Sequence, residues 1–295
     1  MTTTRTGSFP IGFRNNVPHW EKDISAAVAF MKAEGFETID LTGGSDHGVK
    51  EVLAAGLRIG TMDLVAKFSD MLEADAGVRR ACVERNTAFI ADLAAMNITT
   101  FFTVMFAPDP DVTRTTALGY AIDSYGALCE AVASTGARFV IEGWPGPAPH
   151  YPSLACTPES CRAVLDGVGH AALGLNFDPS HLLRMGINPE RFVDDFADRI
   201  YHVHAKDTEI LTEELYAYGT LQPGTTGEPH AYGSHHWRYC IPGHGAARWP
   251  HLLQKLAALG YTGPTCIELE DENFFASAAD WEAGLMAARD FLIHA

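Results

Sequence analysis

Short apolar segments alternate with longer amphipathic ones along the whole chain. Eight segments have the length and apolar content of buried strands: residues 10–14, 38–42, 58–64, 99–105, 138–144, 173–178, 200–207 and 264–270. Between them, apolar residues recur at the spacing of amphipathic helices, as Leu285, Ala288, Phe291 and Leu292 do near the end of the chain. Eight strands that each precede a helix predict an α/β protein built as a parallel (β/α)8 barrel.

The main alternative to a barrel is an open, doubly wound sheet. The glycine pattern G-x-G-x-x-G, which is typical of that fold, does not follow the first strand segment. No interdomain linker is evident, so we expect a single TIM-barrel domain over residues 1–295.

One long irregular segment, residues 208–247, interrupts the alternation and is rich in Gly, Pro, His and aromatic residues. Segments of this length in a compact domain are usually functional or disordered. Five aromatic residues favour an ordered lid that covers its own site or a neighbouring subunit: Tyr216, Tyr218, Tyr232, Trp237 and Tyr239.

Composition narrows the class of protein. With 47% hydrophobic and 20% charged residues, a chain of 295 residues can bury a full core. The formal net charge of −16 argues against a nucleic-acid partner. No apolar run approaches the roughly 20 residues needed to span a bilayer. The polar start lacks the apolar core of a signal peptide, and the six cysteines are scattered without a CxxC pair, so we expect a reduced, cytoplasmic location.

A barrel places its chemistry at the carboxyl ends of its strands, on side chains that point inward. Because strand side chains alternate between two faces, an outward Ile141 turns Glu142 inward, and the same test turns Asp178, His204 and Glu268 inward. Unpaired carboxylates gathered at the barrel mouth would repel one another and be costly to bury. A divalent cation would remove that conflict, so we predict a metal site at these four residues.

Each of these residues alone also has an ordinary explanation. The run that starts at Asp178 reads Asp-Pro-Ser, which is also typical of a helix N-cap followed by proline. Glu142 could end a strand in solvent. His202 lies deeper along its strand and is better explained as a core histidine, and Glu270 as a residue of the rim. Agreement among four independent strands is what supports the metal site.

Three motifs carry a resemblance to a known family: LGLNFDPSH at residues 173–181, HVHAKD at 202–207 and IE at 267–268. They are similar to the xylose isomerase-like TIM barrel superfamily, which includes sugar phosphate isomerases/epimerases, the AP endonuclease family 2, ketose 3-epimerases, inosose-processing enzymes and endonuclease IV. The resemblance spans nearly the whole chain. It implies that the metal ligands are Glu142, Asp178, His204 and Glu268, and that His181 contacts a substrate oxygen.

The sequence departs from this pattern after Asp207. The insertion there makes the interval between the ligands His204 and Glu268 far longer than in ketose 3-epimerases. It resembles instead a subgroup with a large aromatic loop, close to enzymes that act on 3-keto glycosides. The exact substrate therefore stays open.

The ligand set indicates the chemistry. Mixed carboxylate and imidazole ligands suit Mn²⁺, with Mg²⁺, Co²⁺ or Zn²⁺ as other occupants, and three carboxylates argue against a dedicated zinc site. We predict a divalent-metal-dependent isomerase or epimerase that acts on a sugar-like hydroxy-ketone, which is a ketose, an inosose or a keto-glycoside. Proton transfer would pass through a metal-stabilised enediolate, with Glu142 and Glu268 as base and acid.

Further side chains are candidates for contact with this carbohydrate: His181, Lys206, Trp144, Trp237, Arg238 and His244. Lys206 is explained equally well as a structural ion-pair partner, Trp144 as packing at the barrel rim and His244 as a turn residue. Three residues are expected to support the ligands from behind, namely His202, Asp207 and Glu270. For Asp207 we expect a contact that orients His204 or Lys206.

Three other functions remain as alternatives. A lyase would use the same proton abstraction and then expel a leaving group, as in dehydration or cleavage of a 3-keto glycoside. An endonuclease IV-like enzyme would need more histidines for three zinc ions, and the strand segments 38–42 and 58–64 contain none. An inactive binding protein, or one that needs a partner subunit, is the last alternative. A homo-oligomer is the expected assembly.

Overall fold

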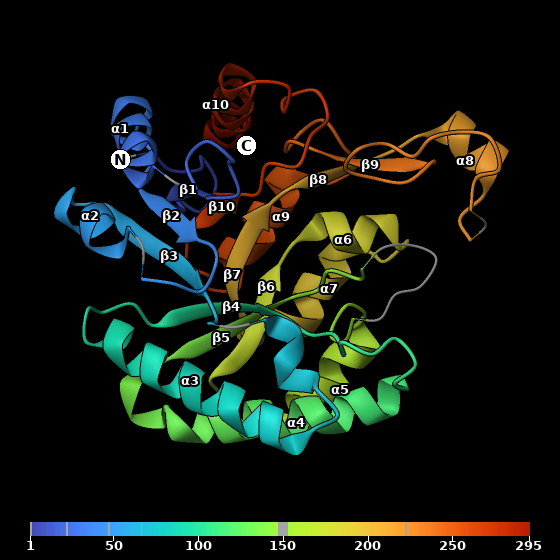
Figure 1. Ribbon diagram of the computed structural model, residues 1–295. Coiled ribbons are helices and arrows are strands. Elements are labelled where there is room, and N and C mark those ends of the chain that lie inside the picture. Colours follow the sequence, from blue (N-terminus) through green and yellow to red (C-terminus); the bar gives the residue numbers. More distant parts are fainter. Residues whose placement is uncertain (1, 22, 47, 66, 147–152, 222) are drawn as a thin grey trace.

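The computed structural model describes residues 1–295 except positions 1, 22, 47, 66, 147–152 and 222. Eight parallel strands form a closed barrel in the order β1-β10-β7-β6-β5-β4-β3-β2 (Figure 1). Their bounds are β1 (Ile11–Arg14), β2 (Thr38–Leu41), β3 (Arg58–Asp63), β4 (Thr100–Val104), β5 (Arg138–Glu142), β6 (Leu173–Phe177), β7 (Ile200–Ala205) and β10 (Thr265–Ile267). Each strand lies within the segment that its apolar run predicts, and the (β/α)8 barrel is confirmed.

Helices surround the barrel on its outer face (Figure 1). The α-helices are α1 (Ile24–Glu34), α2 (Val49–Ala54), α3 (Ala76–Ala94), α4 (Arg114–Ala131), α5 (Pro158–Val168), α6 (Pro179–Arg184), α7 (Pro189–Phe196), α8 (Thr212–Tyr218), α9 (Trp249–Ala258) and α10 (Ala278–His294). Short 3₁₀ helices are η1 (Phe68–Leu72), η2 (Ala133–Thr135) and η3 (Ala197–Arg199). Local signals fix several ends: Thr157 and Ser160 form a capping box that begins α5, and Gly169 ends that helix in a left-handed conformation.

Alternation along the strands separates an apolar layer from a polar barrel interior. Ile141, Phe177 and Val203 are fully or almost fully buried in the large hydrophobic core, which also contains apolar side chains of the surrounding helices. The ring of Phe177 stacks at 6.2 Å on that of Phe192 in α7. Polar neighbours on the same strands, such as Glu142, are also buried but face the inside of the barrel, where they meet one another. The apolar layer packs against the helices, and the polar interior contains the side chains predicted to bind a metal.

The long irregular segment is structured. It contains β8 (Asp207–Ile210) and β9 (Trp237–Cys240), which pair antiparallel, and α8 between them. We call residues 207–240 the arm, because the hairpin leaves the barrel and carries α8 at its far end (Figure 1). Helix α8 has no buried residue, and Tyr216 in it is 90% exposed. The expected homo-oligomer stays a prediction, as does a covering role for the arm. In the described part of the chain, no helix is long and apolar enough to cross a membrane.

Candidate metal and substrate site

Four strands deliver the predicted ligands to one point at the carboxyl end of the barrel. Glu142 is the last residue of β5, and His204 lies in β7. Asp178 and Glu268 follow the last residues of β6 and β10. One ligand atom from each of these four side chains lies within 4.8 Å of the other three, and all four are buried. The sequence-predicted set is therefore brought together.

Charge is concentrated at this cluster. Nδ1 of His204 lies 2.7 Å from Oε1 of Glu142 and 3.6 Å from Oε2 of Glu268. Burial opposes ionisation of Glu142, but the charges of His204 and His181 hold its pKa well below the usual range. Burial and the charge of Glu142 likewise oppose ionisation of Glu268, yet Lys206 and His204 lower its pKa to about 2. Both glutamates are thus held as carboxylates.

Asp178 supplies the clearest sign that a cation fits here. Its Oδ1 accepts a hydrogen bond of 2.8 Å from the backbone amide of Ser180, as an N-cap should. Its Oδ2 is buried and has no hydrogen-bond partner among the described residues, although Nζ of Lys206 lies 3.4 Å away. A buried carboxylate oxygen without a partner is costly. A divalent cation held by Glu142, Asp178, His204 and Glu268 would satisfy it.

Lys206 and Glu270 form an ion-pair system around one ligand. Nζ of Lys206, which is fully buried, contacts the carboxylate of Glu268 and lies 2.9 Å from that of Glu270. The same Nζ lies 4.5 Å from the centre of the Tyr239 ring. These contacts agree with a structural role for Lys206 and a supporting role for Glu270. Lys206 also lines the pocket described below, so a substrate contact stays a prediction.

His181 lies in α6 directly beside the ligands. Its Nδ1 is 2.7 Å from the hydroxyl of Tyr239. Its Nε2 is 3.5 Å from Asp178 and 3.8 Å from Glu142, and it has no hydrogen-bond partner among the described residues. This nitrogen is therefore available to a ligand, as the family resemblance implies.

A pocket of about 280 Å³ opens over the cluster, and we call it the mouth pocket. One wall is apolar and mostly aromatic, and consists of Phe68, Phe102, Val104, Phe106 and Trp144. The other wall is polar and consists of Arg14, Glu142, His181, Lys206, Glu268 and Glu270. Small-molecule pockets combine apolar walls with a few converging polar groups in this way. A sugar ring suits it, because C–H faces can pack on aromatic rings while hydroxyls meet the polar wall.

Three residues expected to contact substrate lie outside the lining of the mouth pocket, as far as the structure describes it. Trp237 is buried, with its ring 4.9 Å from that of Tyr239 and the guanidinium of Arg184 over it at 4.5 Å. Arg238 pairs with Glu209 of the arm and with Glu272, which follows β10. His244 is exposed, and its amide donates to the carbonyl of Ile241 in a turn. Substrate contacts by these three stay predictions.

Asp207 has different partners from those we expected. Its carboxylate accepts hydrogen bonds from the backbone amides of Thr208, Gly243 and Ala247, at 2.8, 3.2 and 2.8 Å. It therefore holds the end of the insertion rather than orienting His204 or Lys206. The physical reason is that Asp207 begins β8, where the chain has already left the barrel, so the nearest polar groups are backbone amides at the end of the insertion.

Two charged residues that contact the ligand side chains are absent from the sequence-based expectations. Arg14, at the end of β1, pairs with both oxygens of Asp63 and lies 3.4 Å from Oε1 of Glu268, with its guanidinium 4.1 Å from the centre of the Phe102 ring. Asp40, in β2, contacts His202 at 2.8 Å. Both could have been found, because the alternation test that turned the ligands inward also turns these two residues inward.

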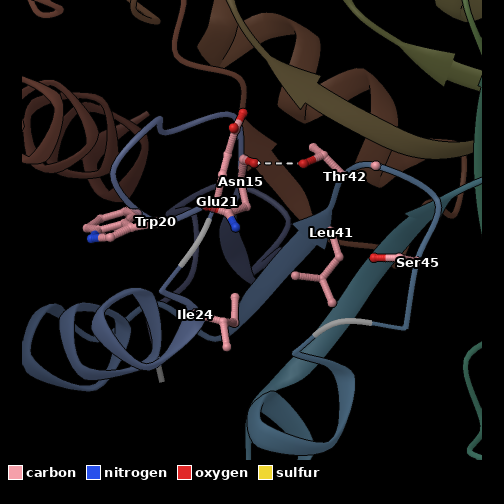
Figure 2. Close-up of a pocket in the computed structure, with 8 residues that line it drawn as sticks. Asn15, Trp20, Glu21, Ile24, Leu41, Thr42 and Ser45 are labelled. Carbon is pink, nitrogen blue, oxygen red and sulfur yellow. Dashed lines mark hydrogen bonds between the residues drawn. The ribbon is translucent and has the colours of Figure 1, made fainter.

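A second hollow, of about 420 Å³, lies beside the mouth at the ends of β1 and β2 (Figure 2). Its lining is Asn15, Trp20, Glu21, Ile24, Leu41, Thr42, Gly43 and Ser45. The hydroxyl of Thr42 donates to the carbonyl of Asn15 at 3.0 Å (Figure 2). Asp63 links the two linings, because it binds Arg14 of the mouth pocket and the backbone amide of Gly43 in the hollow. The hollow contains none of the ligands, so we assign the chemistry to the mouth pocket.

Residues 18–293 match the family described as the xylose isomerase-like TIM barrel. The chain belongs to this family. The resemblance carried by the three sequence motifs is thereby confirmed.

Sequence relatives differ in how much of the chain they match. YfiH of Bacillus subtilis, an uncharacterized protein, is 32% identical over 120 residues, or 40% of this chain and 37% of that protein. A 3-dehydroshikimate dehydratase of Pseudomonas putida is 29% identical over 37% of this chain and 14% of that enzyme. The rhizopine catabolism protein MocC of Rhizobium meliloti is 24% identical over 89% of this chain and 80% of that protein. The chain therefore spans less than half of the length of the first two.

Solved structures share the fold over nearly the whole chain. The IOLI protein with a bound zinc atom has a TM-score of 0.71 at 13% identity, covering 96% of this chain and 98% of that one. D-psicose 3-epimerase from Clostridium cellulolyticum, with D-tagatose, has a TM-score of 0.71 at 14% identity, covering 97% and 100%. The 3-keto-D-glucoside 4-epimerase YcjR from E. coli has a TM-score of 0.66 at 17% identity, covering 96% and 98%. At these identities the likeness shows the fold alone.

Proposed function

We propose that this protein is a divalent-metal-dependent isomerase or epimerase of a sugar-like hydroxy-ketone. The observation that carries the proposal is the meeting of two buried glutamates, Glu142 and Glu268, with Asp178 and His204 directly under the mouth pocket. Relatives of the same fold include epimerases of ketoses and of a keto-glucoside. The donor set favours Mn²⁺ over a dedicated zinc site, because hard carboxylate oxygens outnumber the single imidazole.

Each group in the pocket has a task in this reaction. A bound divalent cation would polarise the substrate carbonyl and stabilise the negative charge that follows proton removal. One of the two glutamates takes the proton from the carbon next to the carbonyl, and the other, after taking up a proton from solvent, returns it to the opposite face for epimerisation. Nε2 of His181 meets a substrate oxygen, and the aromatic wall around Trp144 holds the ring. No net oxidation occurs, because one proton leaves and one returns.

A lyase is the second candidate, and one sequence relative favours it. That relative, from Pseudomonas putida, is named as a dehydratase. Proton removal by the same glutamate would then be followed by loss of a leaving group from the neighbouring carbon. The mass of the product separates the two reactions, because an epimer keeps the mass of the substrate and an elimination product loses it.

An endonuclease of the trinuclear zinc type has less support. Such a site needs several more histidines around the ligands, whereas the four-residue ligand group in the described part of the chain contains one, His204. The net charge of −16 also opposes binding to a phosphate backbone.

Metal content is the first test, measured by elemental mass spectrometry on the purified protein. We expect about one equivalent of Mn²⁺ or a similar ion, lost in both Glu268→Ala and His204→Ala. The control is His251→Ala, because His251 lies in α9 and pairs with Glu190 outside the barrel. About three zinc ions would support the endonuclease instead. A wild-type protein that neither contains nor takes up metal would refute the proposal.

Activity is then sought with ketoses, inososes and 3-keto glycosides in deuterated water. Proton transfer through a carboxylate predicts that solvent deuterium enters the carbon next to the carbonyl, and NMR detects this. Wild-type protein loaded with metal should incorporate it, and protein stripped of metal should not. Epimerisation without any deuterium uptake would argue for a different mechanism.

A further inference from the structure

A carboxylate lies behind the ligand histidine, deeper in the barrel than the metal ligands. Asp40, in β2, is completely buried. Its Oδ1 accepts a hydrogen bond of 2.8 Å from the backbone amide of Thr61. Its Oδ2 lies 2.8 Å from Nε2 of His202 and 3.3 Å from Nε2 of His204. Two imidazoles therefore lie close to Oδ2 of Asp40, while the backbone amide of Thr61 holds the other oxygen of the same carboxylate.

The neighbouring strand leaves room for this arrangement. Gly60 in β3 has no side chain, and a Cβ there would lie 2.3 Å from Oδ1 of Asp40 and 3.2 Å from the His202 ring. The ring of His204 is also stacked on Phe102, with 5.5 Å between the ring centres. The position of Asp40 and the plane of His204 are therefore both set by packing.

The two nitrogens of His204 face different groups. Nδ1 faces the ligand cluster, 2.7 Å from Glu142, while Nε2 faces Asp40. A neutral histidine binds a cation through the nitrogen that carries no proton, and the partner of the other nitrogen decides which one that is. Both nitrogens face carboxylates, which can only accept hydrogen bonds; Nδ1 lies within hydrogen-bond distance of Glu142, whereas Nε2 lies 3.3 Å from Asp40 and makes no hydrogen bond within the described residues. A cation held between Nδ1 and Glu142 would exclude a proton from Nδ1, and Asp40 is then the carboxylate placed to accept the proton on Nε2.

We infer that Asp40 is a positioning residue, which holds the proton of His204 on Nε2 and so leaves the lone pair of Nδ1 directed at the cation. The inference rests on the proposed metal site. His202 contributes from the other side, because it contacts the same oxygen and fixes where Asp40 lies. This gives His202 the supporting role that the sequence suggested, through a residue that the sequence reasoning missed.

Asp40, His202 and Cys266 also form a group in which one potential ligand atom of each lies within 4.8 Å of the others. In this structure Nε2 of His202 already contacts Asp40, so we assign the group to hydrogen bonding. A second bound ion would be the competing explanation. It would appear as two equivalents of metal per wild-type chain, one of them lost in Cys266→Ser, and that result would overturn the inference.

The test is metal affinity of Asp40→Asn, measured by competition of the metal-free protein with a chelating dye for Mn²⁺ and Zn²⁺. We expect the dissociation constant to rise by about 10- to 100-fold, the usual effect of losing such a supporting group. The matched control is Thr103→Val. It removes a buried hydrogen bond to the Tyr125 hydroxyl in the same barrel, away from the ligands, and should leave the affinity unchanged.

A measurement on the wild type keeps the inference testable even if Asp40→Asn does not fold. In the zinc-loaded protein labelled with ¹⁵N at histidine, NMR should show the His204 proton on Nε2 and the metal-bound nitrogen as Nδ1. The opposite tautomer, or a folded Asp40→Asn with wild-type affinity, would overturn the inference and leave the metal site standing. Absence of metal binding by the wild type would refute the proposed function as well.

Discussion

The hydroxyl of Tyr239 lies 2.7 Å from Nδ1 of His181, so the root of the arm reaches into the site even though its tip lies far from the barrel. Tyr239 belongs to β9, and its ring also lies beneath Nζ of Lys206. The insertion between β7 and α9 therefore supports a histidine that faces the mouth pocket.

Replacement of Tyr239 by Phe removes that hydroxyl and little else. We expect kcat/KM to fall by a few-fold to about tenfold, because a hydrogen bond contributes roughly 0.5–1.5 kcal/mol. The metal content should not change, since Tyr239 touches none of the four ligands through its hydroxyl. Steady-state kinetics and elemental analysis on the same sample check both parts. Full activity in Tyr239→Phe would mean that His181 needs no support from the arm.

Conservative substitution should distinguish the two glutamates, which we propose to transfer protons, from the two ligands that only bind the cation. Glu142→Gln and Glu268→Gln keep an oxygen near the cation but lose the ability to exchange a proton. We expect kcat to fall by about 10²- to 10⁴-fold in each variant, the usual contribution of a general acid or base. Single-turnover assays with saturating metal make the comparison. A variant that holds metal and retains most of its activity would exclude that glutamate as base or acid.

Metal should stabilise the fold. Ligand binding to the folded state alone adds about 2.7 kcal/mol to the free energy of unfolding at a free cation concentration of roughly 100 times Kd. Oδ2 of Asp178 is buried and makes no hydrogen bond within the described residues, so it is one group that gains a ligand bond in this way. Urea unfolding with and without Mn²⁺, and after chelation, measures the difference. Equal unfolding curves in all three conditions would be incompatible with a cation at this cluster.

The aromatic wall should govern substrate affinity rather than metal affinity. Trp144→Ala removes the ring that packs edge-on against Phe106, at 6.3 Å, beside the mouth pocket. We expect KM to rise by several-fold, because an aromatic contact contributes about 0.5–1.5 kcal/mol. Phe275→Ala is a suitable control, since Phe275 is 42% exposed and packs on Tyr232 of the arm. Equal KM values in all three proteins would place the sugar elsewhere.

Asp207→Asn tests the role that the structure gives to this residue. The carboxylate ties three backbone amides at the end of the insertion, so its loss should lower the free energy of unfolding by about 1–3 kcal/mol. Metal affinity should stay at the wild-type value. If the affinity falls instead while the stability is unchanged, Asp207 orients a ligand after all.

The sequence alone determined the eight strands and the inward direction of the four ligand residues. Both follow from local rules, namely apolar runs of strand length and the alternation of side chains along a strand. These rules depend only on neighbours in the chain. They therefore apply separately to Glu142 and to Glu268, which are 126 positions apart (268 − 142) in the sequence. The family motifs point to the same residues.

Only the tertiary structure decided which side chains meet across the barrel. Asp40 and His202 are 162 positions apart, and no local pattern states that side chains of β2 and β7, which are not neighbours in the closed barrel, meet in its interior. Arg14 reaches Glu268 because β1 and β10 close the barrel, which is a property of the whole ring of strands. Asp207 turned away from the site because the chain leaves the barrel one residue earlier. Contacts of this kind depend on how the ring of strands closes and on how deep each residue lies inside the barrel. The packing of the complete fold sets both.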